Sequence, residues 1–198
     1  MIQIWHHQVE RVSGTIRDYF DVDLEKNFAT WFSTFILFYC SALLFLIAKR
    51  KSEIDDQWTR AWYGLSAGFL YMSCDEIAEL HETVNSFTTF SWVIPAAIVS
   101  LIMGLIYLRF LLHLRPLFRN LFLLSAAIFL GGALGVEYAT NMYEENGLLN
   151  TLAYNLWTPV EEGMEMGGVI LFIYTLLRYS EEDQAAIGIW AMVTGCIS

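Results

Sequence analysis

Five runs of apolar residues alternate with short polar segments along the chain. They cover residues 28–48, 62–82, 92–112, 121–140 and 158–177. Each run is about as long as a helix that crosses the hydrocarbon core of a bilayer, whereas the strands of a membrane barrel are about half as long and alternate in polarity. The pattern therefore predicts an all-α, polytopic integral membrane protein, a bundle of five transmembrane helices.

Two further segments flank these runs. Apolar residues recur at helical spacing within residues 1–26, which predicts an amphipathic helix lying in the membrane interface. Residues 185–198 are apolar but too short to span, so they are expected to form an interfacial segment or the start of a further helix. Because the chain contains no internal repeat or long linker, residues 1–198 are interpreted as a single membrane domain.

The basic residues predict how the spans are oriented. With five spans, eight of them fall on one side of the membrane: Lys49, Arg50, Lys51, Arg60, Arg109, Arg115, Arg119 and Arg178. The loops on the other side, 83–91 and 141–157, contain no Lys or Arg. The positive-inside rule then places the N-terminus outside and the C-terminus inside.

Composition narrows the possible partners. Hydrophobic residues make up 56% of the 198-residue chain, and its mean hydropathy is +0.46, as expected for a protein whose main partner is the lipid bilayer. The formal charge of −10 argues against binding to nucleic acid through a basic patch. The three cysteines show no paired spacing, so neither a zinc motif nor a redox pair is predicted.

Acidic residues lie at helical spacing in three of the spans, all near the predicted outer surface. The sets that share one helix face are Asp75, Glu79 and Glu82 in the second span, Glu137, Asn141 and Glu144 in the fourth, and Glu161 and Glu165 in the fifth. Charged groups in hydrocarbon cost several kcal/mol each and therefore mark function or a buried partnership. We expect these three faces to form one site.

Carboxylates at close quarters must share protons or hold a cation, and both alternatives remain open here. For the cation, the predicted ligands are Asp75, Glu79, His81, Glu82, Glu137, Glu161 and Glu165. Residues at the edge of this set are Glu76, Glu162, Asn141 and Glu144. An oxygen-rich site with a single imidazole suits a divalent metal ion such as Mn, Fe, Ca or Zn.

Some of these residues also have simpler interpretations. Thr158, Pro159 and Glu161 follow the pattern of a capping box, with Thr158 as the N-cap of the fifth helix. Glu162 would favour the positive end of that helix, whereas Glu165 lies a full turn deeper. A separate pattern concerns packing: glycines four residues apart, Gly131 with Gly135 and Gly163 with Gly167, predict seams where helices approach closely.

Three function classes follow from these features. The first is a protein that holds a divalent metal in the carboxylate cluster, as a sensor or as a subunit of a homo-oligomer or larger membrane complex. The alternatives are a metal-dependent membrane enzyme, an oxidoreductase or hydrolase, and a cation channel or transporter formed by an oligomer. The chain has no Glu-x-x-His ligand pair, phosphate loop or lysine within a span, so no catalytic residue is predicted and enzymatic activity stays open.

The acidic strings also carry a resemblance. Asp75, Glu76, His81 and Glu82, together with the string from Glu161 to Gly167, resemble the "DE…HE" and "EEG-EM-G" motifs at span ends in a group of uncharacterised bacterial polytopic membrane proteins. The resemblance covers the second and fifth spans. It implies the bacterial inner (cytoplasmic) membrane as the location, and it implies no activity.

Overall fold

The computed structural model describes residues 28–78, 93–140 and 152–194, and all elements within these ranges are helical. They are α3 (Phe28–Glu53), α4 (Thr59–Ala78), α6 (Val93–His113), α7 (Pro116–Leu130), the π-helical segment η1 (Gly131–Val136) and α9 (Leu152–Thr194). One helix lies at each of the five predicted apolar runs, which confirms the all-α fold class for the described residues. The predicted interfacial segment 1–26 lies outside them.

Three of the described helices are long and apolar enough to cross a membrane: Phe28–Glu53, Val93–His113, and the continuous rod Pro116–Thr140 that contains η1. Large apolar side chains cover much of their surface, as expected where the surroundings are lipid. Helices α4 and α9 are outside this group; α4 carries two acidic residues and α9 carries six. The length and apolar character of these three helices support the prediction of a membrane protein. The number of five spans and their orientation remain predictions.

The fifth helix corrects two predictions. It begins at Leu152, and Pro159 lies inside it, so Thr158 is not an N-cap and the capping box is not formed. Its other end extends to Thr194, so residues 185–194 continue α9 and are not a separate segment. Proline inside a membrane helix loses one backbone hydrogen bond, a loss that neighbouring helices can compensate. The local capping signal was therefore overridden by the longer helix.

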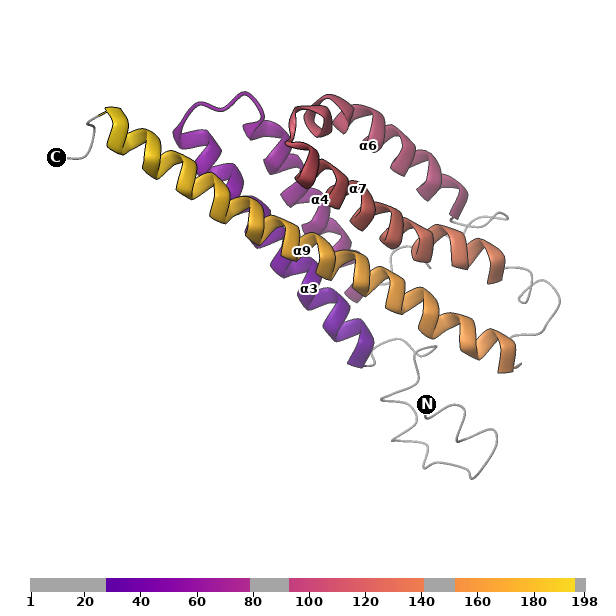
Figure 1. Ribbon diagram of the computed structural model, residues 1–198. Helices are drawn as coiled ribbons and strands as arrows, with labels where there is room; N and C mark the ends of the chain where they lie inside the picture. Colours follow the sequence, from indigo (N-terminus) through magenta and orange to yellow (C-terminus); the bar gives the residue numbers. More distant parts are fainter. Residues whose placement is uncertain (1–27, 79–92, 141–151, 195–198) are drawn as a thin grey trace.

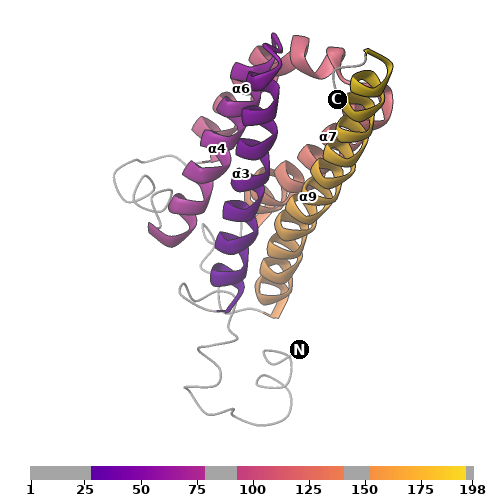
Figure 2. The ribbon, with the colours of Figure 1, turned by 90° about the vertical axis from the view of Figure 1, so that its left-hand side faces the viewer.

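Helix α9 is the longest described element and runs the length of the bundle along one side (Figure 1). It packs against α3 on one side and against α7 and η1 on the other, while α4 packs along the far side of α3 (Figure 2). Helices α3, α6 and α9 begin at the same end of the bundle, where α4 and the rod Pro116–Thr140 end. This arrangement brings the acidic ends of three helices to one end of the molecule.

Helices α3 and α4 are joined by small hydroxyl side chains. The Ser41 hydroxyl donates to the Ser66 carbonyl at 2.8 Å, and the Ser66 hydroxyl donates to the Ser41 carbonyl at 2.9 Å. Nearer the acidic end, the Ser73 hydroxyl donates to the Thr34 carbonyl at 3.0 Å. Small residues let two helix backbones approach, and hydroxyls satisfy their own polarity across such an interface. This seam fixes the position of the acidic last turn of α4.

The opposite end is held by an aromatic cluster around Trp62, which is 1% exposed. Its ring centroid lies 4.9 Å from that of Phe110 in α6, 6.2 Å from that of Phe122 in α7 and 4.9 Å from that of Tyr179 in α9. Such ring pairs contribute energy beyond the area they bury. Trp62 therefore connects four helices at the end away from the carboxylates.

The glycine seams differ from the predicted ones. A Cβ atom added at Gly135, Gly163 or Gly167 would meet no atom within 4 Å. At Gly168 it would lie 2.7 Å from the Phe129 backbone nitrogen, too close for any real side chain. Of the four predicted glycines, only Gly131 would bring an added Cβ against a neighbouring helix within the described chain, 2.9 Å from Cε of Met164, and Gly168, which was not predicted, brings α9 against α7.

Beyond the predicted end of the fifth span, α9 is attached to the turn between α3 and α4 by ion pairs. The Lys51 ammonium lies 2.7 Å from an oxygen of Asp183 and 3.8 Å from one of Asp56. Arg115, at the turn before α7, pairs with Glu182. The Lys51 side chain is only 8% exposed, so its charge depends on these partners. These pairs explain why the helix continues past the predicted boundary.

Candidate functional site

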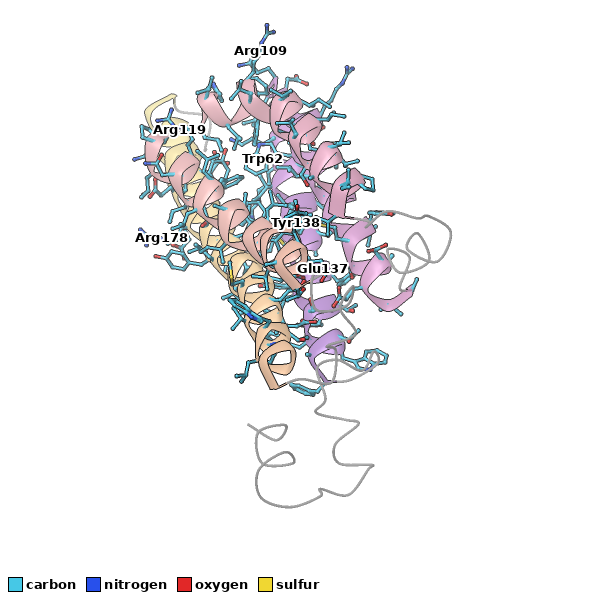
Figure 3. The ribbon with its side chains drawn as sticks, turned by 90° about the vertical axis from the view of Figure 1, so that its right-hand side faces the viewer. Trp62, Arg109, Arg119, Glu137, Tyr138 and Arg178 are labelled. Atoms are coloured by element: carbon cyan, nitrogen blue, oxygen red, sulfur yellow. The ribbon has the colours of Figure 1, made fainter. Side chains whose placement is uncertain are left out.

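Carboxylates from three helices gather at the end where α9 begins. The described members are Asp75 and Glu76 in the last turn of α4, Glu137 directly after η1, and Glu161, Glu162 and Glu165 in α9. All six are partly buried. Figure 3 shows Glu137 well separated along the bundle from the basic residues Arg109 and Arg119. These six carboxylates therefore lie apart from the basic residues, some of which pair with other acids at the opposite end of the bundle.

Glu165 is the centre of this group. Four other carboxylates, Glu162, Glu161, Glu76 and Glu137, lie close enough to act on its charge. Glu161 and Glu137 also form a side-chain hydrogen bond with each other. An ionised carboxylate can only accept hydrogen bonds, so this bond requires a proton on one of the two carboxyl groups. Helix α9 and the segment after η1 thus meet through two neighbouring carboxyl groups, those of Glu161 and Glu137.

A glycine in η1 makes this approach possible. A Cβ atom at Gly132 would lie 2.8 Å from the carbonyl oxygen of Glu161 and 3.2 Å from Cγ of Glu165. Any larger residue would push η1 away from α9 at the level of these two acids. Gly132 therefore sets the distance between Glu137 and the carboxylates of α9.

The π-helical turn sets the direction of Glu137. Segment η1 spans Gly131–Val136, and Glu137 is the next residue. A π-turn adds a residue to a helical turn and rotates everything that follows it, and such turns often occur at functional sites. The direction of the Glu137 side chain therefore depends on η1. A helical wheel with a constant angle of about 100° per residue does not predict it.

The structure describes some of the predicted metal ligands, and the others lie outside the described residues. Those in the described part are Asp75, Glu137, Glu161 and Glu165, and those outside it are Glu79, His81 and Glu82. Of the residues predicted at the edge, Glu76 and Glu162 are described, whereas Asn141 and Glu144 are not. The structure brings Glu137, Glu161 and Glu165 together, and Glu76 acts on Glu165 although the sequence pattern placed it off the main face.

Within the part of the chain that the structure describes, no three His, Cys, Asp or Glu side chains are arranged as ligands of one metal ion. The divalent metal therefore stays a prediction, and its three ligands between Glu79 and Glu82 lie outside the described residues.

Sequence reasoning missed two features that position the site, Gly132 and the π-turn. A signal for the first was present, because glycine occurs as neighbouring pairs, Gly131 with Gly132 and Gly167 with Gly168. Each pair allows two frames for a small-residue seam, and spacing alone does not choose between them.

Residues 2–179 match the family described as Domain of unknown function (DUF8692), and this range includes every described carboxylate of the site. The chain belongs to the DUF8692 family. The DUF8692 match ends at Tyr179, so Glu182 and Asp183 lie beyond it. No curated protein and no solved structure matches the chain.

Proposed function

We propose that this DUF8692 protein is a five-span integral membrane protein that holds a divalent cation in a carboxylate cluster near the outer surface. It would serve as a sensor or as a subunit of a larger membrane complex. The supporting observation is that four carboxylates act on Glu165 from α4, α9 and the segment after η1. Repulsion among these groups in an apolar environment is relieved by a bound cation or by protons.

The same residues indicate how a cation would be held. Glu137 and Glu161 lie side by side, and a cation between them would take the place of a proton that relieves their repulsion. Glu165 would supply a further carboxylate oxygen from the next turn of α9. With oxygen ligands in the majority, hard or intermediate ions such as Ca²⁺ and Mn²⁺ fit best.

A second candidate is a cluster that functions with protons alone. The hydrogen bond between Glu161 and Glu137 favours it, because that bond forms with a proton and without a metal. In this case the protein would respond to the pH at the membrane surface. The two candidates differ in one property: only the first binds added metal.

Metal content and thermal unfolding of the purified, full-length protein in detergent separate the two candidates. With Mn²⁺ or Ca²⁺ at about 100 times its dissociation constant, we expect stabilisation of about 2.7 kcal/mol that a chelator removes. Glu165→Gln should abolish this gain. The matched control is Glu181→Gln on the same helix, whose side chain is 71% exposed in a surface pair with Arg178 and should keep the gain.

The proton candidate predicts the opposite result. Metal and chelator would leave the unfolding midpoint of the wild type unchanged, and Glu165→Gln would be neutral or stabilising, because an amide removes the repulsion among the acids. Absence of stoichiometric metal together with this pattern would reject the cation-binding proposal.

A further inference from the structure

Thr34 carries a buried hydroxyl group that has no hydrogen-bond partner within the described part of the chain. The residue is 8% exposed and lies in the second turn of α3. Backbone carbonyls accept hydrogen bonds at 2.7–3.0 Å from other buried hydroxyls, those of Ser41, Ser66, Ser73, Ser125 and Thr175. A buried polar atom without a partner is unfavourable, and such atoms commonly mark the position of a bound ion or water.

Thr34 lies at the same height along the bundle as the carboxylates of α9. Helices α3 and α9 pack together and begin at the same end (Figure 2), and the Lys51 ammonium contacts Asp183, a residue 132 positions later. Because both helices rise by about 1.5 Å per residue, the same offset places Thr34 opposite Met166, next to Glu165. Glu165 precedes Asp183 by about five complete helical turns, so both residues are on the face of α9 that is turned toward α3.

The α4 side of Thr34 is acidic as well. The Thr34 carbonyl accepts a hydrogen bond of 3.0 Å from the Ser73 hydroxyl, which holds α4 against α3 at this height. Glu76 follows Ser73 by three residues and therefore shares its face of α4. Glu76 also acts on the charge of Glu165. The Thr34 hydroxyl is thus buried where acidic faces of α4 and α9 converge.

We propose that the Thr34 hydroxyl oxygen is a neutral ligand of the cation held by the carboxylate cluster. This inference rests on the function proposed above, and it adds α3 to the helices that hold the ion. A hydroxyl oxygen has lone pairs for a cation, and Ser or Thr hydroxyls bind Mg²⁺ in phosphate loops. It adds an oxygen ligand without adding to the repulsion among the acids. Ca²⁺ and Mn²⁺, which take many oxygen ligands, gain more from it than Zn²⁺, which usually takes four.

Mn²⁺ and Ca²⁺ titrations of the purified, full-length protein in detergent test this assignment. Thr34→Val keeps the side-chain shape but removes the oxygen, so we expect the dissociation constant of the ion to rise about tenfold. The metal-free variant should unfold at the same temperature as the wild type or a higher one, because the hydroxyl it loses has no partner. Thr175→Val is the matched control: that threonine is also buried, but its hydroxyl donates to the Leu171 carbonyl at 2.7 Å, and the variant should bind the ion as the wild type does.

Thr34→Cys tests direct contact with the ion and covers the case in which Thr34→Val does not fold. A sulfur in place of the hydroxyl should weaken Mn²⁺ binding and strengthen Zn²⁺ binding, a reversal that a purely structural role of Thr34 would not produce. Wild-type ion affinity in Thr34→Val, or an unchanged ratio of Mn²⁺ to Zn²⁺ affinity in Thr34→Cys, would overturn the inference and leave the cation-binding function standing. A wild type that binds neither Mn²⁺ nor Ca²⁺ would reject both.

Discussion

The contact between α9 and α7 makes two neighbouring glycines respond oppositely to the same substitution. A Cβ atom at Gly168 would lie 2.7 Å from the Phe129 nitrogen, 2.9 Å from the Phe129 Cβ and 2.9 Å from the Ser125 carbonyl oxygen. None of these atoms is the end of a flexible side chain, so relief requires the two helices to separate. At Gly167 an added Cβ meets no atom within 4 Å.

The expected magnitudes follow from these distances. Both substitutions to alanine gain helix propensity, about 1 kcal/mol each. Only Gly168→Ala also overpacks the interface, which costs about 1–3 kcal/mol. Because the propensity gain is common to both, the difference in unfolding free energy between Gly168→Ala and Gly167→Ala isolates the packing cost and should be about 1–3 kcal/mol. Gly167→Ala itself should be more stable than the wild type.

Reversible unfolding in mixed detergent micelles, with helicity as the signal, measures both variants against the wild type. A Gly168→Ala protein as stable as Gly167→Ala would refute the close approach of α9 to α7. It would also remove the basis for the position of Gly132, because the same helix interface sets both contacts.

Two further predictions concern the opposite end of the bundle and the membrane orientation. Lys51→Met should lower the free energy of unfolding by about 1.5–3 kcal/mol, because the buried ammonium donates a 2.7 Å hydrogen bond to the Asp183 carboxylate. The double variant with Asp183→Asn should cost less than the sum of the two single changes, and additive losses would contradict the pairing. For orientation, a cysteine placed within 146–150 should react with an impermeant reagent added outside cells, and one within 52–56 should not; the reverse labelling would invert the proposed topology.

The carboxylate site shows how much of its arrangement local sequence patterns predict. Helical spacing predicted that acids of the second, fourth and fifth spans would share one end, and the described acids of those spans, from Asp75 to Glu165, do so. Helical spacing did not determine which of these acids come into contact; tertiary packing did. Glu76 acts on Glu165 because of how α4 packs on α3, and Glu137 meets Glu161 because Gly132 and the π-turn bring η1 against α9.

The sequence by itself determined the class of fold and the approximate position of each helix, because the length of an apolar run has to match the hydrocarbon thickness wherever a helix crosses it. It did not determine where α9 begins and ends. The capping pattern at Thr158 is a local preference worth about 1 kcal/mol, and packing along the rest of the bundle outweighs it. At its other end, α9 continues past the predicted boundary to Asp183 and beyond. The Asp183 side chain is paired there with Lys51, a residue more than 130 positions earlier. Only the tertiary structure decides such contacts, since they depend on which helices lie side by side and no local spacing records that.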